Sequence, residues 1–123
     1  VASVLNQDPN KVFKTLVTVA ASKINYVFVI PVNQELDLKK AAKAAGDKDM
    51  ALIPVKELLG LTGYIRGGCS PVGMKKKYPT FIDEVCTLYD RIAVSAGERG
   101  HQMILPPDAL MDLAGAVPCD III

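Results

Sequence analysis

The chain has 123 residues, of which half are hydrophobic and 22% are charged, and its formal net charge is +1. This composition excludes an extended disordered chain, and the length fits a single compact domain over residues 1–123. The near-neutral charge excludes a strong general attraction to nucleic acid. We therefore expect no DNA partner, and an RNA partner would have to be recognised through local patches.

The hydrophobic pattern predicts strands and helices in irregular alternation. We expect a short helical turn at Asp8 and Pro9, then strands over 13–19, 25–32, 50–53, 80–83, 88–95, 102–105 and 117–122. Helices are expected over 37–45, 54–59 and 107–114, each followed by a glycine that stops it (Gly46, Gly60 and Gly115). The first two strands pair as a hairpin across residues 20–23. The sum is an α+β fold with a mixed, barrel-like sheet and surrounding helices.

The length of the apolar runs and the spacing of the cysteines limit where the protein works and what it binds. The longest apolar run, around Tyr26 to Val32, is too short to cross a membrane, so we expect no membrane partner. Three widely spaced cysteines favour a reducing, cytoplasmic setting. They form no C-x-x-C pair and His101 is the single histidine, so the pattern predicts no metal site. The chain opens on Val1, so we expect residues to be missing at its front.

Gly67-Gly68-Cys69-Ser70-Pro71 is the most informative segment. Adjacent glycines let successive backbone N–H groups form a concave nest that binds a carbonyl oxygen or an anion. An isolated segment of this kind is more often a tight surface turn. The hydroxyl of Ser70 either shapes the loop or touches a substrate. Tyr64, just upstream, either stacks on a base or belongs to the core.

Two further side chains are candidates for chemistry. Lys14 lies in an otherwise apolar strand, so its ammonium group either reaches solvent or projects into a cleft. Cys69 lies beside the glycines and would suit a nucleophile, but no base is evident near it in the sequence. We therefore favour a small buried residue at Cys69. His101 alone is more often structural than catalytic.

Several motifs, in order, resemble the YbaK/EbsC family, free-standing relatives of the editing domain of bacterial prolyl-tRNA synthetases. Val12-Phe13-Lys14-Thr15-Leu16 is similar to that family's V-[FY]-K-T-L element. Thr62-Gly63-Tyr64 followed by Gly67-Gly68-Cys69-Ser70-Pro71-Val72-Gly73 is similar to its T-G-Y-x-x-G-G-x-S-P-x-G signature. The segments 36–46, 79–83 and 95–100 extend the resemblance, which runs from residue 6 to residue 122.

The resemblance implies hydrolytic editing of mischarged tRNA, in trans, without a cofactor. The nearest pattern removes cysteine from Cys-tRNA(Pro) and also acts on Cys-tRNA(Cys). Lys14 matches the motif lysine that is essential for activity, and Gly67, Gly68 and Ser70 match the loop that lines the aminoacyl pocket. We also expect Tyr64 to contact substrate. The implied mechanism is attack by the substrate's own thiol on its ester, with the enzyme supplying position and electrostatics.

Departures from the family pattern leave alternatives open. Some members have aspartate where Gln102 stands here, and Gln102 keeps a hydrogen bond to substrate but not the charge. Members also carry a longer N-terminal segment with a tyrosine near the pocket. One alternative is a deacylase for another ester, such as Ala-tRNA(Pro), which would need a positioned water. The others are a non-catalytic tRNA-binding module and a Cys69-based hydrolase. The expected partners are the 3′ acceptor end of aminoacyl-tRNA and a prolyl-tRNA synthetase that selects the tRNA.

Overall fold

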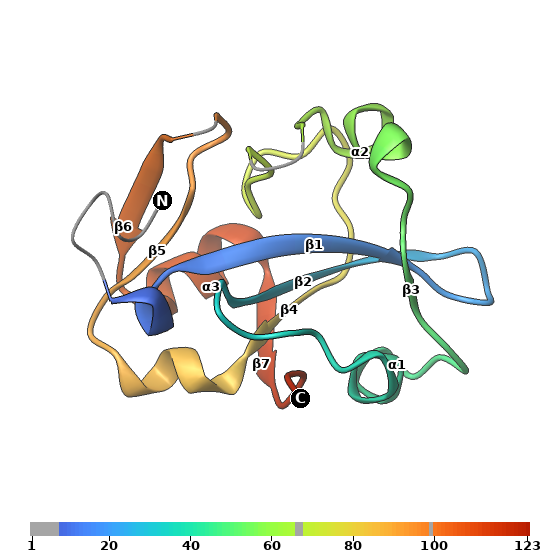
Figure 1. Ribbon diagram of the computed structural model, residues 1–123, viewed down its shortest axis with the longest axis horizontal. Coiled ribbons are helices and arrows are strands. Elements are labelled where there is room, and N and C mark those ends of the chain that lie inside the picture. Colours follow the sequence, from blue (N-terminus) through green and yellow to red (C-terminus); the bar gives the residue numbers. More distant parts are fainter. Residues whose placement is uncertain (1–7, 66–67, 99) are drawn as a thin grey trace.

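The fold is built on a five-stranded sheet, seen in a computed structural model that describes residues 8–65, 68–98 and 100–123 (Figure 1). Its strand order is β3-β1-β2-β4-β7, with β1 at Phe13–Val19, β2 at Asn25–Pro31, β3 at Ala51–Leu52, β4 at Thr80–Asp83 and β7 at Ala116–Cys119. β1 pairs antiparallel with β2 and β3, whereas β4 runs parallel to β2 and to β7. A separate antiparallel pair consists of β5 (Ile92–Ser95) and β6 (Gln102–Leu105).

The α+β class and the mixed sheet are confirmed, but the sheet does not close. β3 and β7 are its two edges, each paired on one side within the described residues. The barrel-like part of the expectation is therefore not met.

Strand β2 is apolar from Tyr26 onwards because it is central, with cores on both of its faces. Phe28 and Ile30 face α1 (Leu38–Ala45), in a cluster that includes Ala41 and Ile121. Val29 faces the opposite way, into a cluster that includes Leu110 of α3 (Pro107–Ala114). All of these side chains are fully buried. The sheet thus separates α1 on one side from α2 (Val55–Thr62) and the β5–β6 pair on the other (Figure 1).

Local capping explains where the confirmed helices begin. Asp8 opens the short 3-10 helix η1 (Pro9–Lys11) by accepting a 2.9 Å hydrogen bond from the N–H of Asn10. Asp37 accepts from the N–H groups of Lys39 and Lys40 at 3.0 and 3.1 Å, which caps α1. The predicted hairpin between β1 and β2 is also present, with Lys23 at its turn.

The predicted end of the second helix is wrong. α2 continues through Gly60 and ends at Gly63, whose φ is +84°. Gly60 lies inside the helix, and a Cβ atom added to it would meet no described atom within 4 Å beyond the backbone of its own helix. A glycine at this position therefore does not by itself end the helix. The hydroxyl of Thr62 donates to the Leu58 carbonyl at 2.8 Å and accepts from the Tyr64 N–H at 3.0 Å. These two bonds complete the last turn, and the left-handed conformation that ends a helix falls on Gly63.

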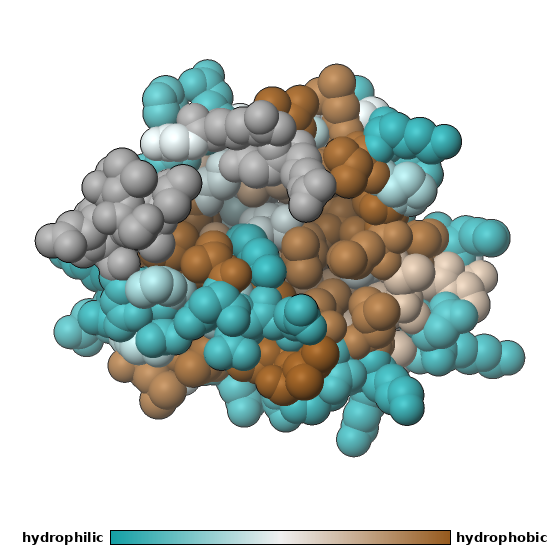
Figure 2. Space-filling view, in the orientation of Figure 1, coloured by the Kyte–Doolittle hydropathy of each residue, from teal (hydrophilic) through white to brown (hydrophobic). Residues whose placement is uncertain are grey.

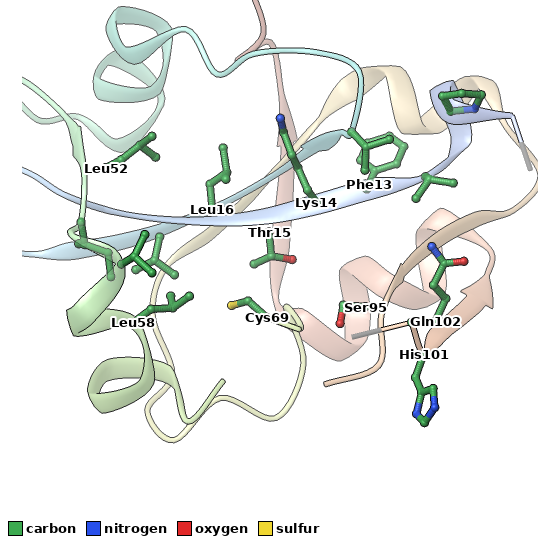
Figure 3. A pocket seen from close by; sticks show the side chains of 17 residues that line it. Phe13, Lys14, Thr15, Leu16, Leu52, Leu58, Cys69, Ser95, His101 and Gln102 are labelled. Atoms are coloured by element: carbon green, nitrogen blue, oxygen red, sulfur yellow. The ribbon is translucent and has the colours of Figure 1, made fainter. Parts of the chain in front are cut away.

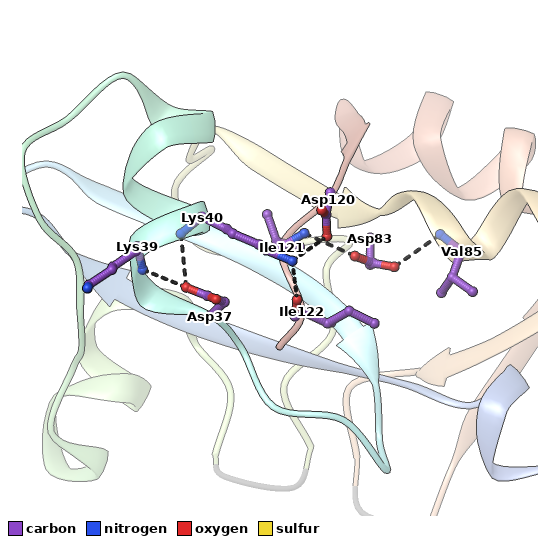
Figure 4. A network of polar contacts seen from close by, with 8 residues as sticks. All are labelled: Asp37, Lys39, Lys40, Asp83, Val85, Asp120, Ile121 and Ile122. Atoms are coloured by element: carbon purple, nitrogen blue, oxygen red, sulfur yellow. Dashed lines mark hydrogen bonds and ion pairs between the residues drawn. The ribbon is translucent and has the colours of Figure 1, made fainter.

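The strand predicted over 25–32 ends one residue early, at Pro31, and three other predicted strands are shorter by two residues or more. Residues 84–88 form the 3-10 helix η2 (Glu84–Leu88), so the strand predicted over 88–95 begins only at Ile92. Asp83 starts η2 by accepting from the N–H of Val85 at 3.0 Å. The strand predicted over 117–122 ends at Cys119, because the other oxygen of Asp83 accepts from the N–H of Ile121 at 3.1 Å (Figure 4). The strand predicted over 50–53 consists of Ala51 and Leu52 alone.

The C-terminal segment is held against α1 by Lys40. Its Nζ atom lies 3.1 Å from Oδ1 of Asp120 and donates to the carbonyl of Ile122 at 2.8 Å (Figure 4). Ile122 also bridges to Leu36, just before the helix. The end of the chain is therefore anchored on the α1 side of the sheet, and the α2 side is left for the pocket described next.

Candidate functional site

A pocket of about 830 Å³ runs along β1 between α2 and the β5–β6 pair. Its floor is formed by residues 12–17, one wall by Leu52, Ile53, Val55 and Leu58, and the opposite wall by Ser95 and residues 100–102. Cys69 lies between the walls (Figure 3). The lining is mainly apolar with a few polar groups, and its volume falls in the range of small-molecule sites.

The pocket follows a stretch of β1 that has a sheet neighbour on one side only. β3 pairs with Thr18 and Val19, and the N–H of Ile53 adds a bond of 3.1 Å to the Val17 carbonyl. At the other end, Val12 forms an isolated parallel bridge with Ala93. Between these points, no described residue pairs with the edge of β1 that faces away from β2. That edge carries unpaired backbone N–H and C=O groups into the pocket.

Lys14 lines the pocket, but its side chain leaves β1 on the face opposite to Thr15, Cys69 and Ser95 (Figure 3). It is half-buried. The alternation of side chains along a strand imposes this arrangement, because Lys14 shares its face with Leu16, which packs towards the α1 cluster. The structure therefore brings Lys14 to the pocket without bringing it to the glycine loop.

The described part of the glycine loop is buried and shaped by its own hydrogen bonds. The N–H of Gly68 donates to the Ile65 carbonyl at 3.0 Å. The hydroxyl of Ser70, which is 2% exposed, accepts from the N–H of Val72 at 3.2 Å. Of this loop, Cys69 lines the pocket. Gly67, which we expected to contact substrate, lies outside the described residues.

Tyr64 holds the glycine loop in place through a hydrogen bond and a close packing contact. Its hydroxyl donates to the Val72 carbonyl at 2.7 Å, and its ring lies where a Cβ atom on Gly97 would meet it at 3.0 Å. Gly97 also has a φ of +107°, so a side chain there would be strained as well as crowded. Tyr64 therefore links the glycine loop to the turn between β5 and β6. The prediction that it also contacts substrate stays a prediction.

Gln102 and His101 enter the pocket from β6 and the turn before it. The Oε1 atom of Gln102 is buried and has no partner among the described residues. Such an acceptor usually pairs with a ligand or water. His101 is exposed, and its Nδ1 atom lies 3.0 Å from Oε2 of Glu98. Figure 3 shows its ring directed away from Cys69.

Cys69 has surroundings that suit a packed thiol better than a nucleophile. Burial raises the pKa of its thiol to about 11, and the hydrogen bond with the Thr62 side chain offsets only part of that effect. It packs with Val17 and Val27. A nucleophilic cysteine needs the opposite, a lowered pKa and a base at hand. The geometry thus favours the small buried residue expected from the sequence.

Sequence reasoning missed three contributions to the pocket. These are the open edge of β1 at Thr15, the hydroxyl of Ser95, and the apolar wall of Leu52, Val55 and Leu58. The wall residues Leu52 and Val55 are more than half exposed, and hydrophobic surface gathers over β1, β3 and α2 (Figure 2). In the sequence, the apolar residues on both sides of Pro54 were the one signal for this wall. A cluster of apolar side chains that stays exposed on the surface often marks a binding site.

The described residues contain neither a cluster of metal-ligating side chains nor a membrane-spanning helix. In the ranges 8–65, 68–98 and 100–123, no group of three or more His, Cys, Asp or Glu side chains could hold a metal ion. In the same ranges, no helix is long and apolar enough to span a membrane.

Residues 1–113 match the family of aminoacyl-tRNA editing domains. The chain belongs to this family. The match covers β1, the glycine loop and the β5–β6 pair, which together form the pocket. The resemblance inferred from the motifs is confirmed, and so is the expected class of enzyme. The domain edits aminoacyl-tRNA, so aminoacyl-tRNA is its partner.

Relatives and solved structures agree with this assignment. The chain is 52% identical over 113 residues to EbsC of Enterococcus faecalis, named as a proposed Cys-tRNA(Pro)/Cys-tRNA(Cys) deacylase, with 92% of this chain and 69% of EbsC covered. It is 30% identical over 103 residues to a proline–tRNA ligase of Shouchella clausii, with 84% of this chain and 18% of the ligase covered. A crystal structure described as a proposed trans-editing enzyme for prolyl-tRNA synthetase superposes with a TM-score of 0.89 at 27% identity, over 99% of this chain and 76% of the other.

Proposed function

We propose that the chain removes cysteine from Cys-tRNA(Pro), and also acts on Cys-tRNA(Cys), by using the thiol of the substrate as the nucleophile. The observation that carries the proposal is a pocket whose described lining residues include a lysine and several neutral polar groups but no activated nucleophile. Cys69 is the one cysteine among those described lining residues, and its thiol has a pKa of about 11, so roughly one molecule in ten thousand would be a thiolate at pH 7. Similarity to EbsC supports cysteine as the amino acid.

The proposed reaction transfers the acyl group within the substrate. The cysteinyl sulfur attacks the ester carbonyl, a carbon–sulfur bond forms, and the bond to the ribose oxygen breaks. The proton lost by the thiol ends on that ribose oxygen, which restores the tRNA hydroxyl. The product is a cyclic thioester of cysteine, and water then opens it to free cysteine. The protein contributes position and electrostatic stabilisation, which suffice for an intramolecular step.

Lys14 is the residue to which we assign the electrostatic part. An ammonium group at the pocket stabilises negative charge on the ester oxygens or holds the terminal ribose. Because its side chain leaves the opposite face of β1 from Cys69, it would meet the ester and adenosine end of the substrate rather than the amino-acid side chain (Figure 3). Gln102 would accept a hydrogen bond from the substrate through its Oε1 atom, which no described residue engages. Gly67, Gly68, Ser70 and Tyr64 would shape the loop beside the amino acid.

Choice of tRNA is the second part of the proposal. The net charge of +1 leaves little general attraction to the tRNA body. We propose that a prolyl-tRNA synthetase binds the protein and supplies that choice, and that the reaction takes place in the cytoplasm. Added synthetase should then raise selectivity for tRNA(Pro) over tRNA(Cys). An unchanged selectivity at saturating synthetase would contradict the partnership but leave the deacylase intact.

The deciding experiment measures deacylation of Cys-tRNA(Pro), Ala-tRNA(Pro) and Ser-tRNA(Pro) by wild type, Lys14→Ala and Lys48→Ala. We expect rapid loss of cysteine alone, a fall of about a hundredfold or more in kcat/KM for Lys14→Ala, and no change for Lys48→Ala. Lys48 is an exposed lysine that does not line the pocket, so it controls for lost charge.

Each other outcome selects a different function. Release of alanine in place of cysteine would identify a deacylase that positions water. Release of no amino acid, with the tRNA still bound, would identify a binding module. Equal activity of Lys14→Ala and wild type would overturn the role of Lys14.

A further inference from the structure

The backbone of Thr15 has both of its hydrogen-bonding groups directed into the pocket. The register pairs Thr15 with Val29. The Val12 carbonyl accepts from the N–H of Val32 at 2.8 Å, so even-numbered residues of β1 bond towards β2. The Val17 carbonyl accepts from Ile53 on the opposite edge, so odd-numbered residues face away from β2. The N–H and C=O of Thr15 therefore leave the sheet at the edge that forms the pocket floor.

Among the described residues, no neighbouring strand takes up these two groups. Pairing with β3 begins at Thr18, and the bridge to β5 lies at Val12. No backbone hydrogen bond to Thr15 on this side exists within the ranges that the structure describes. The pocket is mostly apolar, so an unpaired donor and acceptor on its floor are directional binding groups rather than general polar surface.

An aminoacyl ester fits such an edge as a single residue of a strand. It carries an amino N–H donor and a carbonyl acceptor on either side of one α-carbon, as a residue of an antiparallel strand does. In an antiparallel hydrogen-bonded pair, two facing residues exchange both N–H···O bonds. The same geometry lets a peptide add to an exposed sheet edge.

We propose that the aminoacyl group pairs with Thr15 as a one-residue β-strand, its α-amino group donating to the Thr15 carbonyl and its ester carbonyl accepting from the Thr15 N–H. This inference rests on the proposed deacylase function and deepens it. The pairing fixes the ester carbonyl and draws electron density from it through the N–H bond. The bound residue is recognised by its backbone, so this contact selects α-aminoacyl esters as a class.

The pairing also places the amino-acid side chain. Residues that face each other across an antiparallel pair project their side chains on the same face. The substrate side chain therefore lies on the Thr15 face, beside Cys69 and Ser95, and Lys14 lies on the other (Figure 3). Cys69 is 6% exposed and packed against Val17, so this wall gives little room and favours a short side chain.

The first test removes the Thr15 N–H with Thr15→Pro and keeps it with Thr15→Val. Proline is tolerated at an edge position whose N–H does not enter the ladder, so β1 and β2 stay paired. We expect kcat/KM for Cys-tRNA(Pro) to fall about tenfold to a hundredfold in Thr15→Pro, the effect of one strong hydrogen bond, and by a clearly smaller factor in Thr15→Val, which keeps the N–H but alters a pocket side chain. A 3-mercaptopropionyl ester, which keeps the thiol but lacks the amino group, should be cleaved at least tenfold more slowly than the cysteinyl ester by wild type. Full activity of folded Thr15→Pro, or equal cleavage of both esters, would overturn the pairing.

The second test uses unmodified protein and does not depend on turnover. Hydrogen exchange of the Thr15 amide is followed by NMR with and without 3′-cysteinylamido-3′-deoxyadenosine, a non-hydrolysable mimic of the acceptor end. We expect at least tenfold slower exchange at Thr15 and no change at Lys14, whose N–H already bonds to β2. Binding of the mimic with unchanged exchange at Thr15 contradicts the inference.

The experiments distinguish failure of the proposed cysteine specificity from failure of the pairing with Thr15. If wild type releases alanine instead of cysteine, the Thr15 variants are compared on the alanyl ester, and the pairing is judged there. If wild type cleaves no ester, the exchange measurement still decides.

Discussion

The hydroxyl of Tyr64 donates a 2.7 Å hydrogen bond to the carbonyl oxygen of Val72, across the glycine loop. The same ring packs against Gly97, in the turn between β5 and β6. Tyr64 thus holds together two segments that approach the pocket from different parts of the chain. Its hydroxyl is already engaged, which distinguishes it from Gln102, whose buried oxygen has no partner in the part of the chain that the structure describes.

Tyr64→Phe tests this structural role. The ring stays and one neutral hydrogen bond is lost, so we expect the free energy of unfolding to fall by about 1 kcal/mol. Urea unfolding measures it, and kcat/KM should change less than threefold. A tenfold loss of kcat/KM with unchanged stability would instead assign the hydroxyl to substrate.

Cys69→Ala tests whether the attacking thiol belongs to the substrate or to the protein. We expect at least a third of the wild-type kcat/KM to remain, because the high pKa of Cys69 leaves almost no thiolate at neutral pH. Abolished activity in a variant that still folds would restore Cys69 as a nucleophile.

The pH profile of wild type gives an independent check. A nucleophile must be deprotonated, so kcat/KM rises tenfold per pH unit until the pKa of the attacking thiol is reached. A substrate thiol predicts levelling near its ordinary value of about 8.5. Attack by Cys69 predicts a continued rise towards about 11. Rates between pH 6 and 9.5, corrected for uncatalysed hydrolysis of the ester, distinguish the two.

Gln102→Met tests whether the Oε1 atom of Gln102 accepts a hydrogen bond from the substrate. The variant keeps the length of the side chain and removes a buried acceptor that has no partner among the described residues. Stability should therefore stay equal or rise by up to about 1 kcal/mol, whereas kcat/KM should fall about tenfold if the oxygen accepts from substrate. A loss of stability would mean that the amide serves the fold, and Gln102 would then be removed from the site.

The sequence predicts the parts of this molecule that local pattern determines. β1, β2 and the helix capped by Asp37 follow from apolar periodicity and capping, and they are where the pattern places them. The strand expected over 88–95 begins only at Ile92, because the Asp83 side chain bonds to the Val85 N–H and starts a helical turn over Glu84–Leu88. The open edge at Thr15 is harder still, since it depends on where β3 and β5, distant in sequence, stop pairing. Motifs predict that Lys14 matters, but only the strand's alternation in the folded sheet shows that it lies opposite Cys69.

Asp83→Ala should be the most destabilising of these changes. Asp83 is 2% exposed, and its two oxygens accept from the N–H groups of Val85 and Ile121 (Figure 4). Removing the carboxylate leaves two backbone donors without partners, at about 1–3 kcal/mol for each buried group. We expect a total of about 3 kcal/mol and a fall in Tm of roughly 10 °C, measured by urea and thermal unfolding.

Asp108→Ala is the matched control for Asp83→Ala. Asp108 is an exposed carboxylate in the first turn of α3, where its interaction with the helix dipole stabilises by about 0.5 kcal/mol. Asp83→Asn keeps an acceptor for one of the two donors and should fall between the alanine variant and wild type. If Asp83→Ala costs no more than the Asp108 control, the junction of β4, η2 and the C-terminal segment does not depend on this carboxylate. Because neither Asp83 nor its two bonding partners line the pocket, kcat/KM should be unchanged at temperatures where Asp83→Ala remains folded.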